Sequence, residues 1–140
     1  MTTTIPGLDR STCTAAATGA AGVCLAFAGV QVALAAGAPL GEHVWGGTQD
    51  RLLPTKMRIV AGGSAVALTA MATVVLRRAG LVGHPARWLT PATWTIAGFL
   101  AVNTIGNLAS TSTVERFVFA PATAAAAGLT AIVARETSCR

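Results

Sequence analysis

The stretch from residue 15 to residue 38, AAATGAAGVCLAFAGVQVALAAGA, contains no charged side chain and decides the class of the fold. As a helix that rises about 1.5 Å per residue, it is long enough to cross a hydrocarbon core about 30 Å thick. Three further stretches are apolar and almost free of charge: residues 57–76, 92–110 and 117–134. A soluble domain would show amphipathic stripes in place of such runs. The sequence therefore predicts an all-α, integral membrane four-helix bundle.

The overall composition agrees with this class. Hydrophobic residues make up 53% of the chain and charged residues 11%, whereas soluble globular domains carry about 25% charged residues. Four spans within 140 residues leave little chain for a separate soluble domain. We therefore expect a single transmembrane domain over residues 1–140, with membrane lipids as its surroundings.

The net charge of +5 comes from basic residues at the ends of the predicted spans. One side of the predicted bundle holds six of them: Arg10, Arg77, Arg78, Arg87, Arg135 and Arg140. The other side holds four: Arg51, Lys56, Arg58 and Arg116. The positive-inside rule then predicts both termini in the cytoplasm, for a multi-pass protein of the cytoplasmic membrane. Charges placed in this way signal topology, so we expect no nucleic-acid partner.

The first span also has to be compared with a secretory signal peptide. Asp9 and Arg10 give a neutral leading region, and the apolar run is long for a signal peptide. We therefore expect a retained helix, in which Gln31 is the one strongly polar side chain.

Cysteine and histidine indicate neither a disulfide nor a metal site. Cys13 and Cys139 lie on the predicted cytoplasmic side, where reducing conditions disfavour a disulfide, and Cys24 lies within the first span. We expect three unpaired thiols. His43 and His84 fall on opposite predicted sides, so the sequence predicts no metal site and no cofactor.

The end of the third span is unusually polar. Asn103, Asn107 and Ser110 stand at i, i+4 and i+7, which places them on one face of a helix. Glu115 and Arg116 follow at the same predicted side of the membrane. Polar side chains within a membrane need partners or water, because lipid offers none. The pattern predicts either a ligand-binding pocket near the outer face or hydrogen bonds between helices with an interfacial ion pair.

The loop after the first span is the second candidate. It contains Gly41, Trp45, Gly46 and Gly47, and Trp45 is typical of a membrane interface. We consider two roles for this loop: a lid over the polar pocket, with Trp45 as a ligand contact, or an interfacial anchor. Glu115 and Asp50 are weak candidates for a catalytic proton donor or acceptor.

Small residues recur at four-residue steps, as in Thr18, Gly22 and Ala26, in Gly63 and Ala67, and in Ala120, Ala124 and Gly128. Such spacing allows helix backbones to approach closely in lipid. It favours a compact bundle and indicates packing without identifying a partner.

A resemblance covers nearly the whole chain. Trp45-Gly46-Gly47 follows the first span, and the run from Asn103 to Ser110 is followed by Ser112, Glu115, Arg116 and Pro121. In this layout the chain resembles small four-helix integral membrane proteins found in actinobacteria. We associate no activity with that group, so the resemblance implies the architecture and assigns no functional residue.

Three hypotheses for the function remain open. The first is a non-catalytic membrane component that packs with itself or with a partner protein. The second is a protein that binds or transports a lipid or a small apolar molecule through the polar pocket. The third is a membrane-embedded enzyme that acts on an apolar metabolite, which requires Glu115 to point inward.

Overall fold

The computed structural model describes residues 9–136, which form four long helices and no strand. The long helices are α1 (Arg10–Ala36), α2 (Thr55–Arg78), α3 (Leu89–Ala109) and α4 (Ala120–Arg135). Two short 3₁₀ helices, η1 (Gly41–His43) and η2 (Trp45–Gly47), lie between α1 and α2, and a π-helical turn, η3 (Glu115–Phe119), leads directly into α4. The predicted all-helical fold with four helices is confirmed.

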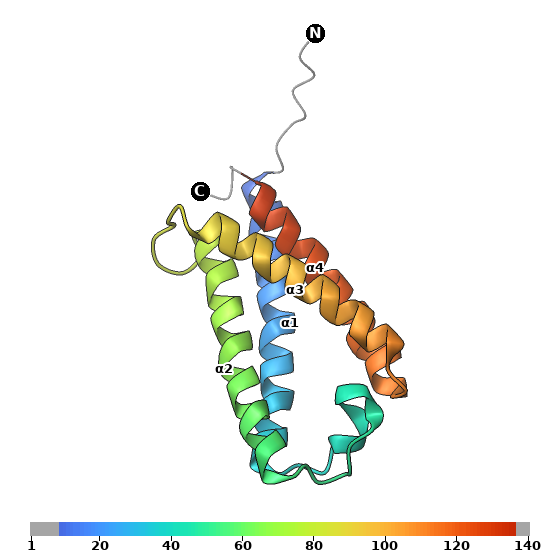
Figure 1. Ribbon diagram of the computed structural model, residues 1–140. Coiled ribbons are helices and arrows are strands. Elements are labelled where there is room, and N and C mark those ends of the chain that lie inside the picture. Colours follow the sequence, from blue (N-terminus) through green and yellow to red (C-terminus); the bar gives the residue numbers. More distant parts are fainter. Residues whose placement is uncertain (1–8, 137–140) are drawn as a thin grey trace.

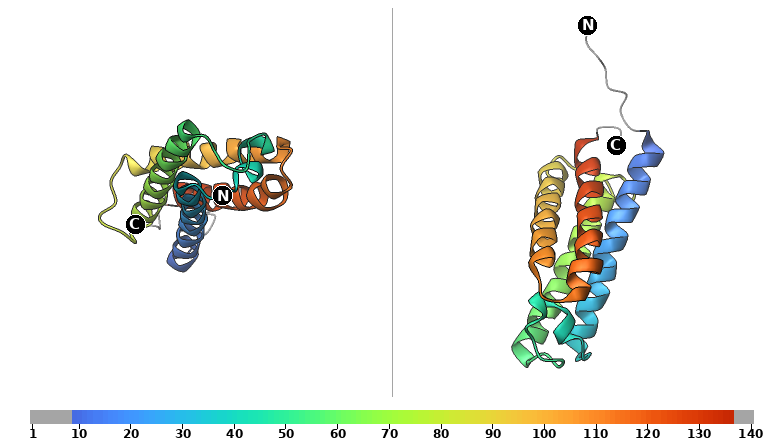
Figure 2. Two further views of the ribbon diagram at one scale, coloured as in Figure 1. Left: turned by 90° about the horizontal axis from the view of Figure 1, so that it is seen from below. Right: turned by 90° about the vertical axis from the view of Figure 1, so that its right-hand side faces the viewer.

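The helices form two antiparallel pairs. α1 packs along α2, and α3 packs along α4. Figure 1 shows that the pairs meet at the end of the bundle that holds both termini and diverge toward the opposite end. The segment with η1 and η2 folds back into the diverging end and lies beside η3, as the two views of Figure 2 also show. The site described below is formed at this diverging end.

Local capping shifts α1 relative to the predicted span of 15–38, so that it begins five residues earlier and ends two residues earlier. The Asp9 carboxylate accepts a hydrogen bond of 2.8 Å from the backbone N–H of Thr12 and thereby begins the helix at Arg10. Gly37 ends the helix in a left-handed conformation, with φ of 97°, which glycine adopts without steric cost. The polar side chains before the apolar run are therefore part of the helix.

Three helical stretches are long and apolar enough to cross a membrane: Arg10–Ala36, Thr55–Arg78 and the continuous segment Glu115–Arg135. The remaining predicted span, residues 92–110, corresponds to α3, which has 21 residues but is not among these three. α3 carries no charged side chain, but Asn103, Asn107 and several threonines keep its mean hydropathy below that of the apolar windows in these three stretches.

The core at the converging end is built from small side chains. α1 contributes a stripe of six buried residues, namely Cys13, Ala16, Ala17, Ala20, Ala21 and Cys24. This stripe packs against Ile96 and Leu100 of α3 and against residues of α2 and α4. The contact between α1 and α4 is so close that a Cβ atom on Gly19 would lie 3.0 Å from Cδ1 of Leu129. Alanine at most of these positions lets the backbones approach each other.

Most of the small-residue faces noted in the sequence do not pack within the described bundle. Thr18, Gly22 and Ala26 of α1 are exposed, as are Gly63 and Ala67 of α2 and Ala124 and Gly128 of α4. In α1 the buried stripe is the neighbouring one, because alanine is so frequent that several faces of the helix satisfy the same spacing. The pattern indicated close packing but not the face that packs.

The prediction of three unpaired thiols is also wrong, because Cys13 is disulfide-bonded. Cys13 lies near the start of α1, with 1% of its surface exposed. Cys24 is free and buried within α1. Cys139 and Arg140 lie outside the described residues.

We expect Asp9→Ala to lower the melting temperature of the purified protein at neutral pH. Hydrogen bonds from the backbone of Thr12 and from the hydroxyls of Ser11 and Thr12 hold the pKa of Asp9 below its usual value of 3.8. Its contribution is therefore present above that value and is lost as the pH falls through the lowered pKa. Thermal unfolding followed by circular dichroism tests this, with the exposed acid Asp50→Ala as the control. Equal melting temperatures for wild type and Asp9→Ala at neutral pH would contradict the cap.

Candidate functional site

A cavity of about 210 Å³ lies between α1, α2 and α3 at the diverging end of the bundle, bounded by η2 and η3. Most of its lining is apolar: Phe27, Val30, Val44, Trp45, Ala67, Leu68, Met71, Phe99, Leu100 and Phe119. Six polar residues also line it: Gln31, Ser64, Asn103, Asn107, Glu115 and Thr123. An apolar cavity with a few polar groups is typical of a site for a small molecule.

Glu115 is the one charged residue in this lining. Its side chain is buried, with 5% of the residue's surface exposed. Oε2 accepts a hydrogen bond of 2.8 Å from the backbone N–H of Gly46 and a second one from the hydroxyl of Ser110. Among the described residues no donor reaches Oε1 and no basic side chain pairs with the carboxylate. One carboxylate oxygen of this lining residue therefore has no hydrogen-bond donor among the described residues.

The π-helical turn places Glu115 at this position. The backbone N–H of Ala120 bonds to the carbonyl of Glu115, five residues earlier. Pro121 has no N–H and cannot donate to the carbonyl four residues before it. A single π-helical turn accommodates such an interruption, and turns of this kind are frequent at functional sites.

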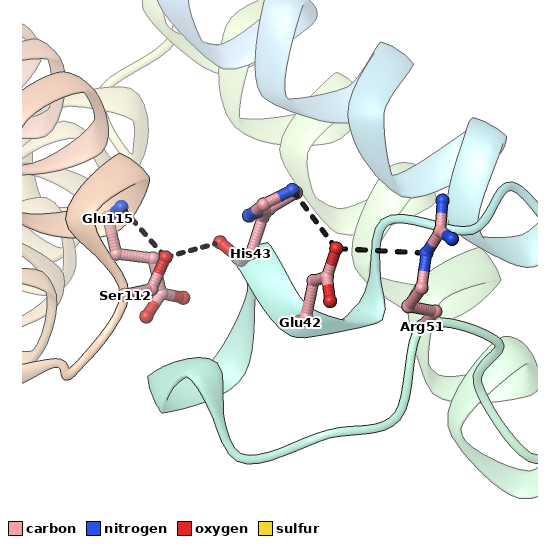
Figure 3. Close-up of polar contacts among 5 residues, drawn as sticks. All are labelled: Glu42, His43, Arg51, Ser112 and Glu115. Carbon is pink, nitrogen blue, oxygen red and sulfur yellow. Dashed lines mark hydrogen bonds and ion pairs between the residues drawn. The ribbon is translucent and has the colours of Figure 1, made fainter.

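Hydrogen bonds join the turn between α3 and η3 to the loop between α1 and α2. The Thr111 hydroxyl donates to the carbonyl of Gly46 at 2.6 Å, and the Ser112 hydroxyl donates to the carbonyl of His43 at 3.2 Å. Ser112 Oγ in turn accepts from the backbone N–H of Glu115 at 3.4 Å. Figure 3 shows this chain from Glu115 through Ser112 to His43. The loop is thereby fixed against the helix that carries Glu115.

The backbone of the loop is strained where it meets the site. Trp45 has φ of 50° and is the one residue other than glycine with positive φ among the described residues. This conformation is unusual for an aromatic side chain. Gly46 and Gly47 follow with φ of 84° and 71°. Strain of this kind persists where surrounding contacts hold it, and it is frequent at ligand-binding sites.

Asn103 and Asn107 both line the cavity with Glu115, on the face that their spacing predicted. Asn103 Nδ2 donates to the carbonyl of Phe99 at 3.1 Å, and Asn107 Nδ2 donates to Thr123 Oγ1 at 3.4 Å. Ser110 does not line the cavity, and its hydroxyl is instead bonded to Glu115. The structure thus brings together four of the predicted ligand-binding residues: Asn103, Asn107, Glu115 and Trp45.

Two of the candidate residues lie elsewhere. Arg116 is exposed, and its guanidinium lies 5.8 Å from the ring centre of Phe117 rather than beside Glu115. Asp50 is exposed and is not part of the cavity lining. The nearby pairs of Glu42 with His43 and with Arg51, at 3.6 and 3.7 Å, are exposed too (Figure 3).

Gln31 was not predicted as a site residue, although it lines the cavity. Its Oε1 is buried and has no hydrogen-bond partner among the described residues. The signal was present in the sequence, because a single strongly polar side chain within an apolar span marks a functional position. Phe27, Phe99 and Phe119 were missed for a different reason, since nothing in their spacing separates a cavity wall from the core.

The chemistry available in the cavity is that of one carboxylate and several amides and hydroxyls. No second ionisable side chain lines it, so the lining lacks a pair of groups for acid–base catalysis. Over residues 9–136 no three histidine, cysteine, aspartate or glutamate side chains come together as a metal site. The arrangement is suited to binding.

No family model, no curated protein and no solved structure matches this chain.

We expect Gly47→Ala to loosen the loop more than Gly46→Ala does. Both substitutions place alanine at positive φ, which costs about 1–2 kcal/mol. Only at Gly47 would the new Cβ also meet a neighbour, since it would lie 3.0 Å from the backbone nitrogen of Ser112. Overpacking adds about 1 kcal/mol or more.

Hydrogen–deuterium exchange of residues 41–47 measures the difference. We expect faster exchange in Gly47→Ala than in Gly46→Ala. Equal exchange in the two variants would show that the loop does not pack against the turn at Ser112.

Proposed function

We propose that this chain is an integral membrane protein that binds a small, mostly apolar molecule in the cavity beside Glu115. The observation that carries the proposal is the cavity itself, whose lining combines three phenylalanines with an available carboxylate oxygen and the unpartnered Oε1 of Gln31. Its volume of about 210 Å³ is below the roughly 300 Å³ at which sites for drug-sized ligands begin. The ligand is therefore small.

The outward-facing side chains support a position in the membrane. Ile59, Val66 and Phe117 are each at least 70% exposed, and apolar surface on this scale suits contact with lipid tails. α2 and α4 both run from the diverging end to the end that holds the termini. If both cross the membrane, α3 must cross it between them. This is why we propose four spans although α3 is not among the three stretches that are apolar enough by composition alone.

We further propose that the protein resides in the cytoplasmic membrane with both termini inside the cell. The six basic residues assigned to the terminal end, against four at the other, support this orientation. The disulfide at Cys13 favours the reverse orientation, because disulfides persist in oxidising compartments. The two observations make opposite predictions about labelling from outside the cell.

We expect a membrane-impermeant maleimide to label Thr48→Cys in intact cells and to leave His84→Cys unlabelled until the membrane is opened. Both positions are exposed and lie at opposite ends of α2. The variants are made in a chain whose three native cysteines are replaced by serine. The reverse labelling pattern would place the end with Cys13 in the oxidising compartment. Labelling of both positions from the same side would contradict a membrane-spanning α2.

Native mass spectrometry of the protein released from membrane nanodiscs tests ligand binding. We expect a small molecule bound to the wild type and lost in Ala67→Phe, because Ala67 lines the cavity and the added ring fills it. Ala70→Phe is the matched control, since Ala70 is exposed on the same helix outside the lining. Asn107→Leu should also weaken binding, by removing a polar contact without filling the cavity. Identical spectra for wild type and Ala67→Phe would contradict the proposal.

A second candidate function is a non-catalytic component that packs with another copy or with a partner membrane protein. The exposed small-residue faces on α1 and α2 favour it, because a Cβ on Gly22 or on Gly63 would meet nothing within 4 Å in the monomer. Such faces suit close helix contacts in lipid. In the same mass spectra, a second protein chain bound to a protein with an empty cavity would favour this function.

A further inference from the structure

We propose that the occupant of the cavity is an organic cation, a protonated amine that carries a small apolar body. The inference rests on the proposed function and names the class of ligand. It follows from three properties of the lining: its charge, the direction of its hydrogen bonds and its aromatic content.

The charge of the lining is negative and is not compensated within the described part of the chain. Glu115 is buried and accepts only neutral donors, the N–H of Gly46 and the hydroxyl of Ser110. The nearest basic residue in the sequence, Arg116, contacts Phe117 instead. A buried carboxylate without a positive partner is costly. A cationic ligand next to Oε1 supplies the missing charge.

Several amide and hydroxyl groups of the lining donate a hydrogen bond to the protein itself, while several of the oxygen acceptors in the lining receive none. Asn103 donates to the carbonyl of Phe99 and Asn107 donates to Thr123. Thr123 in turn donates to the carbonyl of Phe119 at 2.9 Å, and Ser64 donates to that of Val60 at 3.0 Å.

The groups with no described donor include Oδ1 of both asparagines, Oε1 of Glu115 and Oε1 of Gln31. An ammonium group carries donors and no acceptor, which matches such a set. A ligand that carries only acceptors would leave these oxygens without partners.

Aromatic rings complete the lining. Phe27 and Phe119 meet edge to face, with their ring centres 4.9 Å apart, and Phe99 and Trp45 contribute further aromatic surface. The faces of such rings attract cations, and their area suits an apolar body. Aromatic rings together with a carboxylate therefore favour an amine over an anion or a neutral molecule.

Equilibrium dialysis of the protein in nanodiscs of phosphatidylcholine tests the proposal with three probes of similar size. These are 2-phenylethylammonium, neutral 2-phenylethanol and anionic phenylacetate, and uptake by empty nanodiscs is subtracted. We expect the ammonium to bind at least about tenfold more tightly than the alcohol, as is typical of hydrogen bonds to a charged group, and phenylacetate not to bind. Equal binding of the alcohol and the ammonium would overturn the cation proposal and leave the proposed function standing. Binding of none of the three probes would contradict both.

Glu115→Gln keeps the size of the side chain and an oxygen that accepts from Gly46, so it removes mainly the charge. We expect it to abolish the preference for the ammonium over the alcohol. Glu42→Gln is the matched control, because Glu42 is an exposed acid in the loop outside the lining. A preference that persists in Glu115→Gln would overturn the role of this carboxylate. If Glu115→Gln does not fold, the comparison of the three probes on the wild type still tests whether the cavity prefers a cation.

The same ammonium chemistry is found in free amines and in the headgroup of phosphatidylethanolamine. Dialysis in nanodiscs that contain this lipid separates the two sources. Binding of 2-phenylethylammonium that falls as phosphatidylethanolamine is added would identify the lipid headgroup as the occupant. Binding that stays constant would identify a free amine.

Discussion

The carboxylate of Glu115 is the contact on which the diverging end of the molecule depends. It accepts the N–H of Gly46 from the loop after α1 and the hydroxyl of Ser110 from the turn after α3. These two segments belong to different helix pairs, which separate toward this end (Figure 1). The hydrogen bonds of Thr111 and Ser112 and the apolar cluster that contains Val44, Trp45 and Phe119 support the same link. The same carboxylate lines the cavity and is the one ionisable group in its lining.

Much of the fold could be predicted from the distribution of charge. Apolar runs indicated the four helices, and each observed helix overlaps its predicted span, because long unbroken runs of this kind have few alternatives in folded proteins. The residues at which the helices begin were harder to predict. Asp9 begins α1 earlier than the apolar residues do, and the π-helical turn before Pro121 depends on hydrogen bonds that no periodicity reveals. The packed face of α1 was missed because alanine occurs on every face of that helix.

The candidate site could be predicted in part. Asn103, Asn107 and Glu115 lie together because helical spacing and a short turn fix their relative positions. Trp45 joins them through a contact between segments about 70 residues apart, as the Gly46–Glu115 hydrogen bond shows, and such contacts are not visible in local sequence. Arg116 was expected in the site because it follows Glu115, yet the π-helical turn buries one side chain and exposes the next. Long-range contacts and local helix geometry set the limit of the prediction.

The alanine-rich stripe on α1 has a consequence for how this protein tolerates mutation. In most cores the principal hazard is the loss of volume, when a large side chain is replaced by a smaller one. Here Ala16, Ala17, Ala20 and Ala21 have little volume to lose. The hazard is the gain of even one or two methyl groups, because neighbouring backbones that lie so close cannot make room without separating. We therefore expect this stripe to tolerate only alanine, glycine, serine and cysteine, while the outward faces of the same helix can exchange one apolar side chain for another.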